Sequence, residues 1–213
     1  MICMKTIVRL FAVCSCAVSM LAACSTVNVK QPAGDKAATL DPEKWEGTWL
    51  GADGLRCVAK IADPAKGLLE IRSTSPGDKE EVSYLIVREL KDRLVATVAA
   101  KPGEKIPEES GAGFFRIAMA DEHVVLFMPR GELFSKAVTN KQIAGTIRKA
   151  DKSNQIDRDL TVLDKFGSAE VDKLPLAKKG SVLECFDPDP AFVVVREKPP
   201  AAKEQGSKSE PNK

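Results

Sequence analysis

Apolar and polar side chains alternate along most of the middle of the chain, which is the pattern of a β-sheet with one buried and one solvent-exposed face. The alternation is clearest over 69–72 and 143–148. Apolar-rich runs bounded by turn residues predict further strands at 45–51, 55–61, 82–90, 94–99, 114–120, 123–128, 181–186 and 191–195. About nine or ten short strands at this spacing are typical of an antiparallel β-barrel or β-sandwich.

Two interruptions of the alternation predict short helices. Four apolar residues between 133 and 138 share one face at helical spacing, which predicts a helix over 131–139. Ser168 is a candidate N-cap of a second helix, which Pro175 would end. We therefore expect a mainly β fold, an antiparallel barrel or sandwich, with one or two short helices.

An apolar run near the N-terminus follows a short basic segment. Lys5 and Arg9 precede the run at 10–21, and no acidic residue comes before it. This order is typical of an export signal. About twelve apolar-biased residues make roughly 18 Å of helix, well short of the ~30 Å hydrocarbon core, so a permanent membrane span is not expected. Residues 1–23 are therefore predicted to be a signal peptide.

The apolar run ends in Leu21-Ala22-Ala23-Cys24, which resembles the lipobox of bacterial lipoproteins. The resemblance implies that the Cys24 thiol receives a diacylglyceryl group and that the chain is cut before Cys24. Two or three acyl chains, at about 0.8 kcal/mol per buried methylene, hold a protein at a membrane. Ser25 stands where an aspartate favours inner-membrane retention in this family. The resemblance thus predicts a lipid-anchored protein of the cell envelope, at the outer membrane facing the periplasm.

The charge balance argues against nucleic acid as a partner. Of the 32 Lys and Arg residues, Lys5 and Arg9 leave with the signal, so the mature chain carries as many basic as acidic residues, of which there are 30. Nucleic-acid binding needs a basic stripe or patch, and attraction to anionic lipids needs a polybasic segment. The sequence shows neither feature.

Composition divides the mature chain into three parts. Residues 24–44 contain prolines, glycine and scattered charge without apolar periodicity, which predicts a flexible tether reaching up to about 70 Å at ~3.3 Å per residue. Residues 45–196 have a suitable length for one β-domain with one core. Residues 197–213 contain no apolar side chain larger than alanine, which predicts a disordered tail.

Only Cys57 and Cys185 remain in the predicted β-domain. Both lie in phase with apolar neighbours, so both are expected to point inward. In an oxidising compartment two such thiols often pair, and closing so long a loop would stabilise the fold by roughly 4 to 5 kcal/mol. The alternative, two separately buried free thiols, stays open.

The domain opens with two tryptophans around Gly47-Thr48-Trp49, and this Gly-x-Trp segment resembles the first-strand motif of lipocalins. In that family the tryptophan closes one end of an up-and-down barrel, and the barrel holds an apolar ligand. The alternative is that both tryptophans simply pack the start of a β-domain, since aromatic side chains bury large areas in any fold.

Residues that would support catalysis or metal binding occur only singly. His123 is the one histidine, no Gly-x-Ser-x-Gly turn is present, and no C-x-x-C pair is present. The segment 151–157 lacks the glycine and glutamate of a calcium loop. We therefore expect no metal, no cofactor and no enzyme activity, and a β-domain that works by binding or interaction. A lipocalin-like carrier of a small apolar ligand is the first alternative, and an enzyme of unknown class is the second.

Overall fold

The computed structural model describes residues 26–99, 101–120, 122–150 and 159–198. The predicted signal peptide, Cys24 and the tail beyond 198 lie outside the described residues, as does the segment 151–158. The structural statements below concern the described residues only.

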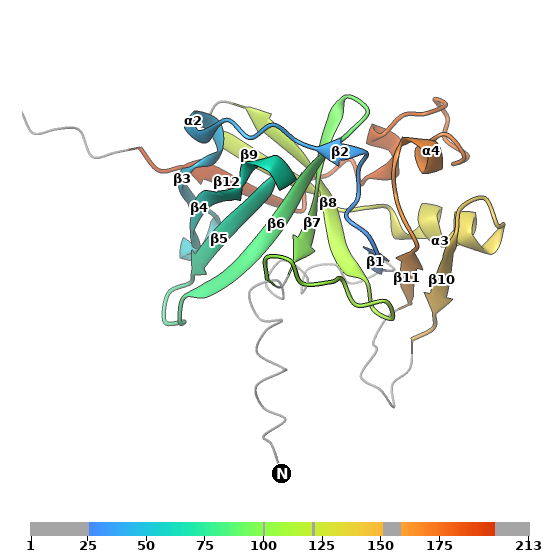
Figure 1. Ribbon diagram of the computed structural model, residues 1–213, viewed down its shortest axis with the longest axis horizontal. Helices are drawn as coiled ribbons and strands as arrows, with labels where there is room; N and C mark the ends of the chain where they lie inside the picture. The colour runs from blue at the N-terminus through green and yellow to red at the C-terminus, as the bar shows by residue number, and fades with distance from the viewer. Residues whose placement is uncertain (1–25, 100, 121, 151–158, 199–213) are drawn as a thin grey trace, which may run out of the picture.

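Eight antiparallel strands form a closed barrel (Figure 1). They are β3 (Gly47–Leu50), β4 (Arg56–Asp63), β5 (Leu68–Thr74), β6 (Glu81–Leu90), β7 (Arg93–Ala99), β8 (Ala112–Ala120), β9 (His123–Phe127) and β12 (Phe192–Arg196). Strands β3 to β9 each pair with the next along the chain, and β12 pairs with both β9 and β3, which closes the ring. The predicted mainly β fold is confirmed, and of its two forms the structure is the barrel.

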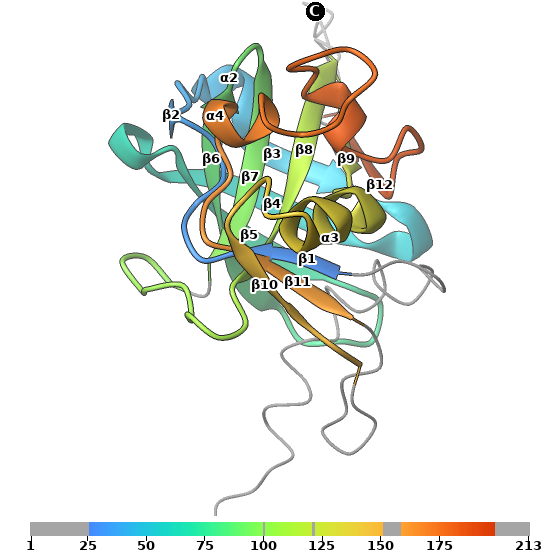
Figure 2. The same ribbon diagram turned by 90° about the vertical axis from the view of Figure 1, so that its right-hand side faces the viewer.

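A second layer covers one side of the barrel (Figure 2). Its sheet consists of β1 (Thr26–Val29), β11 (Leu160–Leu163) and β10 (Gly145–Arg148), and β1 joins this sheet to β8 of the barrel. The remaining elements are the two-residue strand β2 (Lys36–Ala37), the helices α2 (Pro42–Trp45), α3 (Gly131–Thr139) and α4 (Ser168–Val171), and the 3-10 turns η1 (Ala52–Gly54), η2 (Pro64–Lys66) and η4 (Leu183–Cys185).

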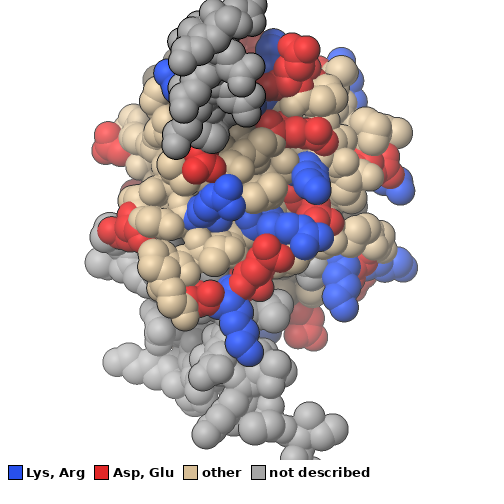
Figure 3. Space-filling model, turned by 90° about the vertical axis from the view of Figure 1, so that its left-hand side faces the viewer, with Lys and Arg blue, Asp and Glu red and all other residues tan. Residues whose placement is uncertain are grey.

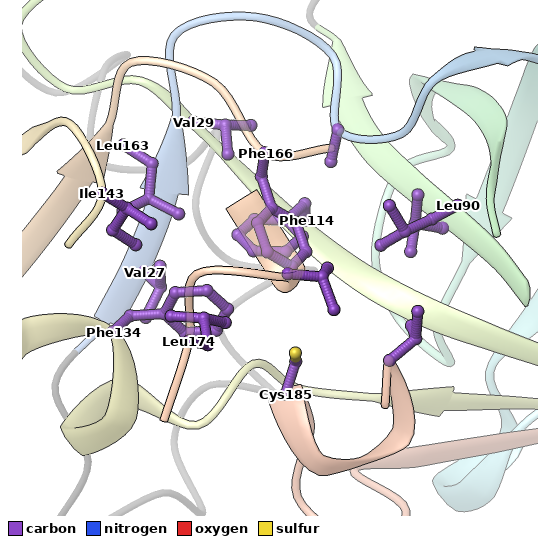
Figure 4. Close-up of a cluster of buried hydrophobic side chains, with 14 of the residues drawn as sticks. Val27, Val29, Leu90, Phe114, Phe134, Ile143, Leu163, Phe166, Leu174 and Cys185 are labelled. Atoms are coloured by element: carbon purple, nitrogen blue, oxygen red, sulfur yellow. The ribbon is translucent and has the colours of Figure 1, made fainter. Parts of the chain in front are cut away.

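The two layers give the protein two separate hydrophobic cores. We call the first the outer cluster; it lies between the barrel wall and the second layer and is built around Phe114, Phe134, Phe166 and Phe186, each at most 2% exposed. Figure 4 shows Phe114, Phe134 and Phe166 within this cluster. We call the second the barrel cluster; it fills part of the barrel with Ala38, Leu40, Trp45, Leu69, Val87, Ala96 and Ile117. The expectation of a single core is therefore wrong.

The predicted flexible tether at 24–44 is also wrong for residues 26–44. Strand β1 pairs in parallel with β11 over all four of its residues, and Val27 and Val29 are 3% and 0% exposed. The following segment runs along β6 and ends in α2. β1 is only four residues long and closely follows the apolar run of the predicted signal peptide. Its alternation is therefore too short to reveal a strand in the sequence pattern.

The predicted helices and the last strands have mixed outcomes. Helix α3 has the predicted bounds, and α4 is shorter than predicted. Ser168 is the first residue of α4 and not its N-cap, since its amide and hydroxyl both donate to Asp35. The strand predicted at 181–186 is instead the 3-10 turn η4, whose backbone hydrogen bonds close locally.

Candidate functional site

The inner face of the barrel is predominantly apolar. Leu69 on β5 lies opposite Leu85 on β6, and Val87 lies opposite Ala96 on β7. Because side chains alternate between the two faces of a strand, this register directs one set of residues into the barrel and the other set outward. The inward set includes Val98 on β7, which lies opposite Leu85. The barrel therefore has an interior able to make apolar contacts from several strands.

Helix α2 and Arg196 close one end of the barrel. Arg196 Nη1 donates to the Glu46 carbonyl at 3.0 Å, and Nη2 donates to the Lys44 carbonyl at 2.5 Å. Its guanidinium carbon lies 4.5 Å from the centre of the Trp49 ring. Trp45, from α2, is 7% exposed and belongs to the barrel cluster. These contacts fasten the helix over this end of the barrel.

Trp49 therefore lies where the Gly-x-Trp resemblance led us to expect a tryptophan, at a closed end of an up-and-down barrel. It is 4% exposed. Arg196, its partner on β12, was not recognised from the sequence because the two residues are far apart along the chain. The only available signal was a cation at the end of the last apolar run. Membership in the lipocalin family stays a prediction.

Many apolar side chains elsewhere on the inner face are only partly buried. Eight apolar residues pack against the barrel cluster yet keep contact with solvent, and they come from six strands: Ile61, Ile71, Leu85, Leu94, Phe115, Met119, Val124 and Leu126. A barrel filled by its own side chains would bury inward residues almost completely, as protein interiors are close-packed. The partial exposure leaves part of the apolar inner face accessible to solvent.

The two cysteines lie in different cores. Cys57 lies opposite Trp49 and Ser73, which directs its thiol to the inner face of the barrel, whereas Cys185 belongs to the outer cluster. Both are free thiols, so the predicted disulfide is wrong: each thiol points toward apolar neighbours, but on opposite sides of the barrel wall. Burial raises the pKa of the Cys185 thiol to about 12 and also raises the pKa of Cys57.

A hollow of about 300 Å³ lies where the segment before β2 and the segment leading into α4 meet β6, outside the barrel interior. Its charged groups are already paired within the protein. Asp35 accepts the Ser168 amide at 2.9 Å and the Ser168 hydroxyl at 2.5 Å, and Glu170 accepts the Gly167 amide at 3.1 Å. Burial opposes ionisation of Asp35, but these hydrogen bonds and nearby Arg88 outweigh it and lower its pKa. This arrangement joins the two layers and needs no ligand.

Arg116 is a buried cation that sequence reasoning missed. It stands on the outward face of β8, is 8% exposed, and its guanidinium carbon lies 3.7 Å from the centre of the Phe127 ring. Its Nε has no hydrogen-bond partner among the described residues. Burial lowers the pKa of Arg116, and nearby Arg93 lowers it further. The Arg116 charge is therefore stabilised by the Phe127 ring and not by a carboxylate.

The remaining candidate residues form no further site in the described part of the chain. His123 begins β9 as predicted, is exposed, and lies opposite Ala120 and Val195. Within the described ranges no three His, Cys, Asp or Glu side chains gather as metal ligands would. The segment 151–157, considered as a calcium loop, lies outside those ranges. On the face shown in Figure 3, positive and negative side chains are interleaved. Ion pairs such as Arg72 with Glu70 at 2.7 Å occur among the described residues.

Among the helices of the described residues, none combines the length and apolar character needed to cross a bilayer.

Comparison with protein-family models, with curated proteins and with solved structures gives no match to this chain.

Proposed function

We propose that the protein is a lipid-anchored protein of the cell envelope whose barrel binds a small apolar molecule without transforming it. The observation that carries the proposal is the set of eight partly buried apolar side chains on the inner face. Binding sites for small molecules are concave and lined mainly by apolar and aromatic groups. A molecule that displaced water from these side chains would gain roughly 25 cal/mol per Å² of apolar surface buried on the protein.

The distribution of titratable groups supports binding over catalysis. By strand register the inner face carries Cys57, Arg196 and, near the two ends of β6, Glu81 and Glu89. The guanidinium of Arg196 is committed to α2 and Trp49, and Glu89 is paired with Lys36 at 3.0 Å. A thiol whose pKa is raised by burial is a poor nucleophile at neutral pH. The barrel interior thus offers apolar contact area, whereas general acid–base chemistry needs positioned pairs of groups.

The cellular placement in this proposal depends on Cys24. The lipobox resemblance and the apolar run before it support an anchor made of acyl chains, and Ser25 favours the outer membrane facing the periplasm. An apolar ligand and a lipid anchor are consistent with each other, because the membrane is the largest apolar reservoir available to such a barrel.

A pair of substitutions on one strand tests the ligand site. Ser83 on β6 lies opposite Ile71 and faces the interior, while its neighbour Val82 faces outward and is 44% exposed. Ser83→Phe adds bulk inside the barrel, and Val82→Phe adds the same kind of ring outside it. We expect Ser83→Phe to raise the dissociation constant of a fluorescent fatty acid by about tenfold or more, which is ~1.4 kcal/mol. Val82→Phe should leave the dissociation constant unchanged.

Thermal unfolding of both variants controls for misfolding. If the unmodified protein does not bind the fluorescent fatty acid, or if both variants bind it as the unmodified protein does, the proposed ligand site is wrong.

A second candidate function, binding of a protein partner, is favoured by an exposed apolar stripe on the outer barrel face. Leu50, Val193 and Val195 are 41%, 39% and 38% exposed, and Leu50 lies directly opposite Val195. Contiguous exposed apolar surface marks interaction sites when it is large, and three residues make a small patch. A photoreactive group at Val193 or at Val195 should crosslink one specific partner in intact cells if this function is correct. Val193→Asp should abolish the crosslink that the probe at Val195 forms.

A further inference from the structure

The N-terminal strand fixes the distance between the anchor and the folded domain. β1 begins at Thr26, only two residues after Cys24. Thr26 is itself held in place, since its amide donates to the Asp159 carbonyl at 3.1 Å and it is the first partner in the parallel ladder with β11. Two residues span at most about 7 Å, so the Cys24 Cα lies within about 7 Å of an ordered strand. A lipidated Cys24 therefore leaves no long tether.

Among the described residues, three neighbouring segments form the surface around Thr26. Leu160 on β11 lies opposite Thr26, and Arg148 on β10 lies opposite Leu160. Lys149 forms an ion pair with Asp159 at 2.8 Å. The end of the β7–β8 loop joins the same surface, because the Arg148 guanidinium donates to the Glu109 carbonyl at 3.2 Å. We call the surface formed by Thr26, Glu109, Ser110, Arg148, Lys149 and Asp159 the anchor face.

The charges of the anchor face balance. Arg148 and Lys149 are matched by Glu109 and Asp159, and the Lys149 and Glu109 side chains are 80% and 89% exposed. Unpaired basic residues attract anionic headgroups, and here the acidic partners cancel that attraction. The face is compatible with headgroups of either kind, and the acyl chains alone would hold it there.

The position of β1 also sets which end of the barrel is nearer the membrane. Asn28 and Val29 pair with Gly113 and Ala112, at the start of β8. Helix α2 covers the other end, where β3 begins and where β8 finishes. Figures 1 and 2 both show α2 at the opposite end of the barrel from β1 and the β7–β8 loop. A domain held at Thr26 therefore directs its capped end away from the bilayer.

We propose that the anchor on Cys24 docks the domain directly onto the bilayer, with the anchor face against the headgroups and the α2-capped end pointing away. The inference rests on the lipid anchor of the proposed function and deepens it. The barrel end opposite α2 then lies beside the membrane, so that lipid of the bilayer is the ligand source nearest to the partly buried apolar side chains.

Two native lysines provide a matched test without substitution. Lys149 lies on the anchor face, is 80% exposed and pairs with an aspartate at 2.8 Å. Lys66 lies in η2, on the side of the barrel where α2 lies; it is 76% exposed and pairs with an aspartate at 3.1 Å. The full lipidated chain is reconstituted in vesicles of phosphatidylethanolamine and phosphatidylglycerol and treated with a membrane-impermeant amine reagent, and the modified lysines are quantified by mass spectrometry. We expect Lys149 to react about fivefold or more slowly than Lys66.

A longer linker is the control for the role of the anchor. A flexible Gly/Ser insert of about 20 residues between Ser25 and Thr26 has ends roughly 25 Å apart on average. It should restore the reactivity of Lys149 to that of Lys66 in the vesicle-bound protein.

The outcomes separate the docking inference from the proposed function. Equal reactivity of the two lysines in the vesicle-bound lipidated protein, protection of Lys66 instead, or protection of Lys149 that persists with the insert would each overturn the docking inference. Absence of acyl groups on Cys24 in the protein from its native host would overturn the anchor itself, and with it this part of the proposed function.

Discussion

The two hydrophobic clusters of this protein differ in how completely they are buried. In the outer cluster, Phe114 packs against Phe134, Phe166 and Phe186 with ring centres 5.3 to 6.1 Å apart, and all four rings are nearly inaccessible. In the barrel, eight apolar side chains around the barrel cluster keep contact with solvent. Both regions have similar chemistry, so the difference lies in packing. The outer cluster is closely packed, whereas the barrel retains partly exposed apolar surface, which the proposed function assigns to a bound molecule.

Adjacent phenylalanines on β8 give the largest expected contrast. Phe114 points into the outer cluster, and Phe115 points into the barrel, where it is partly buried. Phe114→Ala should lower the free energy of unfolding by about 3 to 5 kcal/mol, as is usual for a fully buried ring. Phe115→Ala should cost less than half as much. Urea unfolding of the mature chain measures both, and equal losses would contradict the contrast.

The closed end of the barrel should show an intermediate effect. Arg196→Ala removes two hydrogen bonds to backbone carbonyls and the contact with Trp49, which together should cost about 2 kcal/mol of unfolding free energy. Arg56, an exposed arginine paired with Glu197 at 3.1 Å, is the matched control. Arg56→Ala should lower the free energy of unfolding by less than about 0.5 kcal/mol. A loss at Arg196 no larger than at Arg56 would show that the arginine does not fasten α2.

Two valines on β7 sharpen the comparison with the same chemical change. Val95 is 0% exposed in the outer cluster, and Val98 is partly exposed on the inner face of the barrel. Val95→Ala should lower the free energy of unfolding by about 2 kcal/mol, because it removes two buried methyl groups and leaves a cavity. Val98→Ala should cost under about 1 kcal/mol. Thermal unfolding provides the comparison, and a larger loss at Val98 would mean that the barrel interior is the better packed region.

The Cys185 thiol predicts a pH dependence for the outer cluster. Folding raises its pKa from 9.0 to about 12, chiefly through burial. Above pH 9 the unfolded chain loses this proton while the folded protein keeps it, so the unfolding free energy falls as pH rises from about 9 to 12. Between pH 8 and 10 the Cys185 contribution should decrease by about 1 kcal/mol. Cys185→Ala should show a shallower pH dependence; an identical slope would contradict the assignment.

Sequence alternation was a good guide to the barrel strands and a poor guide to everything that depends on distant partners. The long runs of β6 and β8 were predicted to within two residues of their ends. β11 was missed because Thr161, Val162 and Leu163 are all buried, so no alternation exists to detect. The two cysteines were correctly expected to face apolar surroundings, but alternation does not tell which of two cores a side chain enters.

The candidate site was predictable only in part for the same reason. The Gly47-Thr48-Trp49 segment directed attention to the closed end, yet the Arg196 contact that completes this end joins the first and last barrel strands. Alternation shows which side chains face inward but not whether their neighbours fill the space. The partial burial of Leu85 or Phe115 is therefore a property of the closed barrel and not of any single segment.

The most direct test of the central claim is native mass spectrometry of the protein purified from its host membrane in mild detergent. We predict a chain that begins at a lipidated Cys24 and carries one additional apolar molecule, which dissociates on activation and is absent from Ser83→Phe but present in Val82→Phe. A lipidated chain that carries no such molecule in any of the three proteins would contradict the account of the barrel as a binding site.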